Sequence, residues 1–149
     1  MELVRGLHNL RERHRGSVVT IGNYDGVHLG HKHMLASVRE HSRRLGLPPT
    51  VVTFEPTPRE FFEGAAAPSR LMRLREKSDA LPAYGVERAV VLRFDRHMQG
   101  MGAAEFVDRL LVAGLGARHL VVGHDFRFAK RREGTLATLH EAGAKHGFG

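Results

Sequence analysis

The sequence predicts an α/β fold with a doubly wound parallel sheet in a single domain. Short runs of β-branched residues alternate along the chain with longer amphipathic segments, which is typical of a parallel sheet covered by helices on both faces. The 149 residues are 42% hydrophobic and 26% charged, so the chain is long enough and apolar enough to bury a core of its own.

Each expected strand is a brief run of apolar, mostly β-branched residues. The first, Ser17–Ile21, has the sequence SVVTI and is bounded by Gly16 and Gly22, a pattern that favours a buried strand. Three similar runs predict further strands: Thr50–Phe54 (TVVTF), Ala89–Phe94 (AVVLRF) and His119–Val122 (HLVV).

The first expected helix is Lys32–Leu45. It places Leu35 and Val38 on one face with arginines opposite, and Gly46 is suited to cap its C-terminal end. Two further helices are expected late in the chain, at Ala103–Val112 and at Leu136–Lys145.

The remaining helix, Leu71–Tyr84, contains a proline. Because an interior proline removes a backbone hydrogen bond and clashes with the preceding turn, Pro82 predicts an early or kinked end. Lys77 in the same segment is expected to be solvated. The stretch GAAAP at residues 64–68 is expected to be a short flexible piece within the domain.

Composition excludes several classes of protein. The chain has no cysteine, which rules out disulfides and thiolate metal sites. No apolar run approaches the roughly 18 residues of a membrane span, and the N-terminus lacks the apolar stretch of a signal peptide, so a cytoplasmic protein is expected. The net charge of +7 suits a polyanionic ligand, either a nucleotide or a nucleic acid, but also fits an arginine-rich surface that is merely solvated.

In open parallel sheets, ligands bind beyond the carboxyl ends of the strands. That rule singles out three loops, at Gly22–Gly30, Glu55–Pro68 and Gly123–Gly134.

The first of these loops, GNYDGVHLGH, leads directly into a helix. Its glycines let backbone approach a ligand closely, and a helix N-terminus favours phosphate. His28 and His31 lie three residues apart at this junction and could both donate to phosphate oxygens. Two other readings stay open: surface histidines with Asp25 as a helix cap, or a metal site that adds His33. Neither a P-loop nor a G-x-G-x-x-G motif is present.

The ten-residue string, placed after a strand and before a helix, resembles the signature of the nucleotidyltransferase domain of prokaryotic bifunctional FAD synthetases (riboflavin kinase/FMN adenylyltransferases). Its H-x-G-H core, His28 to His31, matches the motif of the wider nucleotidyltransferase class. The resemblance implies a Rossmann-like fold and a reaction in which AMP passes from ATP to FMN, giving FAD and pyrophosphate. It implies Mg²⁺ as activator, and no nucleic-acid or membrane partner. The catalytic residues that it implies are Asn23, Asp25, His28 and His31.

The other two loops extend the resemblance. Residues 54–62 (FEPTPREFF) are similar to the family's flavin-lining stretch, and residues 123–134 (GHDFRFAKRREG) to its G-x-D/N-F-x-F-G-x-x-R-x-G motif. The implied flavin contacts are Pro56, Pro58, Phe62, Asp125 and Phe128, and the implied ATP contacts are Gly22, His28, Gly30, His31, Gly123, Asp125 and Arg127.

The chain departs from the family pattern at two positions. Thr57 stands where the family often has histidine, so a contact from this position is not carried over from the resemblance. Ala129 stands where the family usually has glycine, so alanine is strained there if the position needs a positive φ.

The resemblance runs from about Ser17 to Gly149, where the family continues with an S-S/T-x-x-R segment and a riboflavin kinase domain. Residues 1–149 are therefore expected to be an FMN adenylyltransferase domain that is incomplete at its C-terminus and catalyses poorly alone. The full-length protein is expected to contain the kinase domain. Two alternatives are another H-x-G-H adenylyltransferase, acting on phosphopantetheine or nicotinamide mononucleotide, and a non-catalytic nucleotide- or RNA-binding module.

Overall fold

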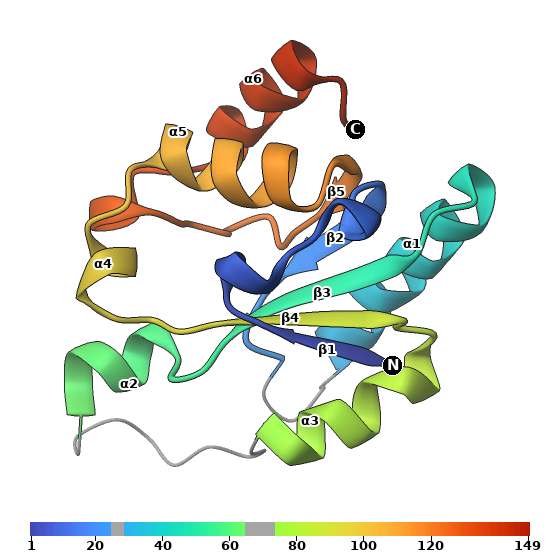
Figure 1. The fold of residues 1–149 in the computed structure, drawn as a ribbon, viewed down its shortest axis with the longest axis horizontal. Helices are drawn as coiled ribbons and strands as arrows, with labels where there is room; N and C mark the ends of the chain where they lie inside the picture. Colours follow the sequence, from blue (N-terminus) through green and yellow to red (C-terminus); the bar gives the residue numbers. More distant parts are fainter. Residues whose placement is uncertain (25–28, 65–73) are drawn as a thin grey trace.

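The computed structural model describes residues 1–24, 29–64 and 74–149 and has a five-stranded parallel sheet at its centre (Figure 1). The spatial order of the strands is β1-β4-β3-β2-β5, and every neighbouring pair runs parallel. The strands are β1 (Glu2–Arg5), β2 (Ser17–Ile21), β3 (Pro49–Phe54), β4 (Arg88–Leu92) and β5 (Ala117–Val121). The prediction of a parallel α/β fold is confirmed.

Four of the strands match the expected runs to within two residues at each end, but β1 was not predicted. Its four residues pair with β4, with Val4 opposite Val90. Val4 is its one buried side chain, flanked by exposed or half-buried residues. A four-residue segment with a single inward side chain has too little alternation to indicate a strand.

Helices cover both faces of the sheet. Figure 1 shows α5 (Ala103–Phe106) and α6 (Leu136–His146) on one side and α3 (Leu74–Ala80) on the other. On that second face α1 (Leu29–Leu45) packs through Leu35. Two short helices, α2 (Pro58–Glu63) and α4 (Arg96–Gln99), follow β3 and β4.

Two of the expected helices are irregular. The one around Pro82 changes after Ala80 from an α-helix to the 3-10 helix η4 (Leu81–Tyr84), so the predicted kinked end is confirmed, while residues 71–73 lie outside the described part of the chain. The helix that begins at Ala103 continues as a π-helix, η5 (Val107–Gly114), a change of winding that side-chain periodicity alone does not reveal.

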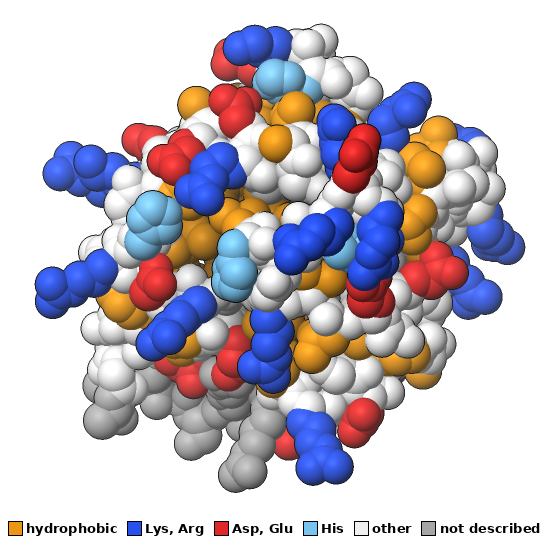
Figure 2. Space-filling view, in the orientation of Figure 1, with side chains coloured by type: hydrophobic (Ala, Val, Ile, Leu, Met, Phe, Trp, Pro, Cys, Tyr) orange, Lys and Arg blue, Asp and Glu red, His pale blue; other side chains and the backbone are white. Residues whose placement is uncertain are grey.

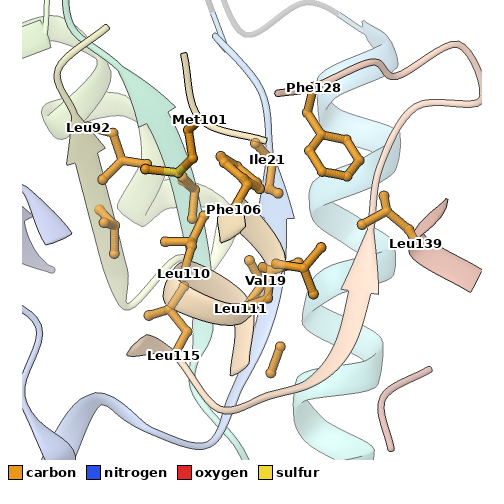
Figure 3. Packing of buried hydrophobic residues seen from close by; sticks show 14 of the residues in the cluster. Val19, Ile21, Leu92, Met101, Phe106, Leu110, Leu111, Leu115, Phe128 and Leu139 are labelled. Atoms are coloured by element: carbon orange, nitrogen blue, oxygen red, sulfur yellow. The ribbon is translucent and has the colours of Figure 1, made fainter. Parts of the chain in front are cut away.

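The core has two layers. On the α5 side, Val19 and Ile21 of β2 pack with Phe106, Leu110 and other apolar side chains (Figure 3). On the α1 side, a smaller cluster joins Tyr24, Leu35, Val51, Leu81 and Val86.

Lys77 is buried, contrary to the expectation from the sequence. Its side chain is only 1% exposed, so the expectation that it is solvated is wrong. A lysine on an inward-facing position of a helix buries its aliphatic stem with its neighbours, which composition and spacing do not reveal. Residues 65–68 of the expected flexible piece lie outside the described residues.

Candidate active site

The strand order reverses beside β2. The chain passes from β2 to β3 and then to β4, and β5 returns to the opposite side of β2. Thr20 pairs with Val121 near the carboxyl ends of these two strands. In open α/β sheets such a reversal opens a crevice between the two loops that follow, and this crevice is where ligands bind.

A cleft of about 980 Å³ opens at this edge of the sheet. Its lining residues come from the ends of β2, β3 and β4, from the loop after β5, and from α2, α4 and α5. Its aromatic lining residues are Phe54, Phe62, Phe94, Phe106, Phe126 and Phe128, and its basic ones are Arg59, Arg96, Arg127, Lys130, Arg131 and Arg132. An apolar wall beside a cationic rim suits a ligand with a flat ring system and phosphate groups.

Four phenylalanines form a connected group at one wall. The ring centroid of Phe94 lies 5.3 Å from that of Phe61, 5.6 Å from that of Phe62 and 6.0 Å from that of Phe54. Phe62 remains 61% exposed. An aromatic side chain fixed on one side by ring contacts and open on the other offers a ready stacking surface.

Helix α2, which carries Phe62, begins at a complete capping box. The backbone N–H of Glu60 donates to Oγ1 of Thr57 (3.2 Å), and the N–H of Thr57 donates to Oε1 of Glu60 (2.9 Å). Thr57 is therefore buried as a helix cap, which gives a structural role to the departure from histidine. Pro58 at the first helical position lines the cleft, whereas Pro56 lines a smaller neighbouring pocket of about 340 Å³.

The loop after β5 is closed by one internal bridge and fastened to the rest of the domain at two points. Phe128 and Gly134 form the antiparallel bridge within the loop. The N–H of Lys130 donates to the carbonyl of Met101 (2.7 Å), and Oε1 of Glu133 accepts from the N–H of Ala103 (2.9 Å). These bonds hold the loop's basic residues over the start of α5.

Ala129 in this loop has φ 70° and ψ −174°. That region is essentially restricted to glycine, because a Cβ clashes with neighbouring backbone there. The expectation of strain at Ala129 is confirmed. Arg131 and Arg132, further along the basic turn, also have a positive φ, 54° in each case.

Phe128 is mainly a core residue. It is 6% exposed, and its ring lies 5.1 Å from that of Phe106 and 5.7 Å from that of Phe126 (Figure 3). Arg127 is exposed and lines the cleft, whereas Asp125 is exposed but is not among the described lining residues. Gly123 accepts from the N–H of Phe126 (3.1 Å) and so closes the turn that contains Asp125.

The loop after β2 is anchored to β3 by two hydrogen bonds before the chain enters α1. The N–H of Gly22 donates to the carbonyl of Val52 (3.0 Å), and the carbonyl of Asn23 accepts from the hydroxyl of Thr53 (3.2 Å). Tyr24 is completely buried, and burial raises the pKa of its phenol to about 12. Asp25 and His28 lie outside the described residues, and Gly30 lies within α1.

His31 stands in the first turn of α1, with its ring centroid 4.7 Å from that of Tyr24. Of the residues expected at the site, Asn23, Pro58, Phe62, Arg127 and Phe128 share the large cleft. Within the described part of the chain, the lining of that cleft does not include Gly22, Gly30, His31, Pro56, Gly123 or Asp125.

The sequence analysis did not identify Phe94 and Phe106 as site residues. Phe94 follows β4 and Phe106 ends α5, yet both line the cleft. Phe94 could have been predicted, because an aromatic residue at the carboxyl end of a parallel strand indicates a position near the ligand site. Phe106 is indistinguishable in sequence from any other core residue of its helix.

The charged side chains on the displayed face are mixed in sign. Figure 2 shows Lys and Arg side chains scattered over the displayed face with acidic side chains between them, rather than gathered into one basic patch. No helix among the described residues is long and apolar enough to cross a membrane.

The fold and the position of the cleft define a class, the Rossmann-like α/β domains that bind ligands where the strand order reverses. The family profile described as FAD synthetase matches residues 10–149, and the chain belongs to the FAD synthetase family.

Curated relatives agree with this assignment. The chain is 53% identical over 148 residues to a bifunctional riboflavin kinase/FMN adenylyltransferase of Pseudomonas fluorescens, covering 99% of this chain and 47% of the relative. It is 46% identical over 149 residues to the protein of the same name from Escherichia coli K12, covering 99% and 48%. The chain thus spans about half the length of these curated relatives.

A crystal structure described as a macrolide-efflux protein from Streptococcus pneumoniae has a TM-score of 0.83 to this chain at 23% sequence identity. The alignment covers 95% of this chain and 47% of that one. At this identity the likeness establishes the fold alone.

Proposed function

We propose that this chain is the FMN adenylyltransferase domain of a bifunctional FAD synthetase and transfers AMP from ATP to FMN. The observation that carries the proposal is the cleft where the strand order reverses, which joins a wall of aromatic rings, with Phe62 exposed, to a rim of arginines and lysine. Membership of the FAD synthetase family supports it. Relatives named as bifunctional, of which the chain spans about half, support a riboflavin kinase domain elsewhere in the full-length protein. Use of ATP fits a cytoplasmic enzyme.

In the proposed reaction an oxygen of the FMN phosphate attacks the α-phosphorus of ATP in line. A P–O bond forms to that oxygen, the bond from the α-phosphorus to the bridging oxygen breaks, and pyrophosphate leaves. The attacking group belongs to the substrate, so the protein contributes position and charge neutralisation rather than a nucleophile.

The proposed roles follow the chemistry of each side chain. His28 and His31 donate to the ATP phosphates at the N-terminus of α1, with Asn23 and Asp25 ordering the loop. Gly22 and Gly30 allow close approach of the backbone to ATP, and Gly123, Asp125 and Arg127 contact it from the loop after β5. Pro56, Pro58, Phe62, Asp125 and Phe128 contact the flavin.

Mg²⁺ would accompany ATP. Within residues 1–24, 29–64 and 74–149 no group of three or more His, Cys, Asp or Glu could hold a metal ion. The ion would be held mostly by phosphate oxygens and water, and there it would neutralise charge on the triphosphate.

The test is FAD formation from FMN, ATP and Mg²⁺ by the full-length gene product, followed by chromatography. His31→Ala is expected to lower the rate by about 10²-fold, the scale of losing one donor to a developing phosphate charge. His33→Ala, an exposed histidine two residues further along α1, is the matched control and should leave the rate unchanged. Absence of FAD with the wild-type protein, or AMP transfer to nicotinamide mononucleotide or phosphopantetheine instead, would refute the proposal. Wild-type turnover in His31→Ala would refute the role of that residue.

A further inference from the structure

Tyr24 is a loop residue with the environment of a core residue. It follows Asn23 at the end of β2, yet it is 0% exposed and packs with Leu35 of α1 and Val51 of β3. Its φ of 52° lies in the left-handed region, which is uncommon for a bulky side chain. The loop therefore turns inward at this residue against its local backbone preference.

The hydroxyl of Tyr24 is anchored on the sheet. It lies 2.5 Å from Oγ1 of Thr20 on β2, and both side chains are completely buried. Each hydroxyl satisfies the other where water has no access, so separating them would leave two buried polar groups unpaired. Burial raises the pKa of the phenol to about 12, so the hydroxyl stays neutral at physiological pH.

Gly22 makes room for the ring. A Cβ at this position would lie 3.1 Å from Cε2 of Tyr24 and 3.5 Å from Cδ2. The ring folds back over the backbone of Gly22 and is confined between the strand and α1. Thr20, Gly22 and Tyr24 together fix the plane of one aromatic ring at the start of the first loop.

That ring faces the imidazole of His31. The two centroids lie 4.7 Å apart with the planes tilted by 43°. His31 is half-buried in the first turn of α1. An aromatic wall at this distance limits the rotamers of the imidazole, and its negative face attracts a protonated ring.

We propose that Tyr24 is a positioning residue for His31: its buried ring holds the imidazole in the orientation that meets the phosphates of ATP. The inference rests on the proposed function for the phosphate role of His31, but the restraint on the ring is independent of it. Tyr24 touches neither substrate in this account and acts only through His31.

Two substitutions separate the ring from the hydroxyl. Tyr24→Phe keeps the aromatic wall and loses only the bond to Thr20, so its kcat should stay within about 3-fold of wild type. Tyr24→Leu keeps an apolar side chain but loses the flat ring, and its kcat should fall about 10-fold while KM for FMN stays within about 2-fold, since small misplacements of a catalytic group reduce the rate that strongly. A role limited to filling the core would affect stability without this split between kcat and KM.

The second measurement does not need turnover. In ¹³C-histidine-labelled protein, the His31 ring protons should show an upfield ring-current shift that Tyr24→Phe retains and Tyr24→Leu abolishes. Thr20→Val, which removes the anchor without touching His31, should broaden those signals. If Tyr24→Leu does not fold, the comparison rests on Thr20→Val, which leaves the Tyr24 hydroxyl without its partner, against Tyr24→Phe, which keeps the ring without a hydroxyl.

The proposal is overturned if the His31 resonances of folded Tyr24→Leu or of Thr20→Val match those of the wild type, whatever happens to the rate. It is also overturned if folded Tyr24→Leu retains wild-type kcat. If the wild-type protein makes no FAD, the proposed function fails, while the ring-current comparison still decides whether Tyr24 positions His31.

Discussion

The ring of Phe128 occupies the space where a side chain on Gly134 would stand. The two residues exchange backbone hydrogen bonds of 3.1 and 2.9 Å, and a Cβ built on Gly134 would lie 2.5 Å from Cε1 of Phe128. The ring has little freedom to move away, because it packs against Phe106 and Phe126. The contact between the Phe128 ring and Gly134 thus helps to fix the conformation of the loop whose exposed basic residues line the cleft.

Gly134→Ala is therefore expected to destabilise the protein. The added methyl must displace the Phe128 ring or open the bridge, and overpacking of this kind costs about 1–3 kcal/mol. Urea unfolding measures the change. Gly100→Ala is the control, since its Cβ would meet its nearest neighbour at 3.6 Å, an ordinary contact. Equal stability of the two variants would contradict the steric account.

Ala129→Gly should have the opposite effect. The backbone of Ala129, with φ 70° and ψ −174°, is in a region that costs a non-glycine residue of the order of 1–3 kcal/mol. Glycine removes that strain but gains freedom in the unfolded chain worth about 0.4–1 kcal/mol, so a net gain of about 1 kcal/mol in the free energy of unfolding is expected. Ala137→Gly in α6, where the backbone is helical, should instead lose about 1 kcal/mol. A loss of stability in Ala129→Gly would show that the loop tolerates alanine there.

Elements with a clear local sequence pattern were predictable from the sequence. Ser17–Ile21 was predicted at its exact bounds because its apolar run is bounded by glycines, and Pro82 marks the place where α3 becomes a 3-10 helix. The strand β1 was not predicted, because it forms by pairing with β4, far away in the sequence, and its four residues carry no clear strand pattern. Lys77 was placed wrongly because burial of a charged side chain depends on which way its helix faces.

Several residues predicted from motifs within one loop line the cleft, whereas lining residues that meet only across the sheet were not predicted. Asn23, Pro58, Phe62, Arg127 and Phe128 come from the three predicted loops and line one cleft. Phe94 and Phe106 reach the same cleft from β4 and α5, and only the order of the strands brings them there. The roles assigned to all of the predicted site residues stay predictions, and His28 and Asp25 also lie outside the described residues.

The carboxylate of Glu2, in the edge strand β1, is expected to make the stability of the fold depend on pH. Glu2 bonds to the Arg13 guanidinium and lies 3.1 Å from Nε2 of His14, a ring that is 1% exposed. Hydrogen bonding to Arg13, and then to His14, lowers the pKa of Glu2 from 4.5 to about 2. Nδ1 of His14 accepts from the N–H of Arg11 (2.8 Å), so Nε2 carries the proton that faces Glu2.

The sign of the effect follows from that shift. Between pH 4.5 and 2 the unfolded chain binds the proton on Glu2 more readily than the folded one, so the stabilisation is complete above pH 4.5 and is lost as the pH falls toward 2. The Glu2 side chain is 34% exposed, and solvent screening reduces the contribution to about 1 kcal/mol. Glu2→Gln should lower stability at pH 7 by that amount and have little effect near pH 2, as measured by urea unfolding. Glu63→Gln, which removes an exposed pair with Arg59, should change stability little at either pH. An equal loss for Glu2→Gln at both pH values would rule out the linkage.

A substitution of Phe62 is expected to change FMN affinity with little effect on stability. It is 61% exposed at the mouth of the cleft, and its ring is held 5.6 Å from that of Phe94. If it stacks on the flavin, Phe62→Ala should weaken FMN binding about 10-fold, since stacking of an aromatic side chain on a base is worth about 1–3 kcal/mol, while the melting temperature barely changes. Quenching of flavin fluorescence on titration measures the affinity. Leu45→Ala, another exposed apolar residue (41%) at the far end of α1, should leave FMN affinity unchanged. Wild-type affinity in Phe62→Ala would place the flavin ring elsewhere in the cleft.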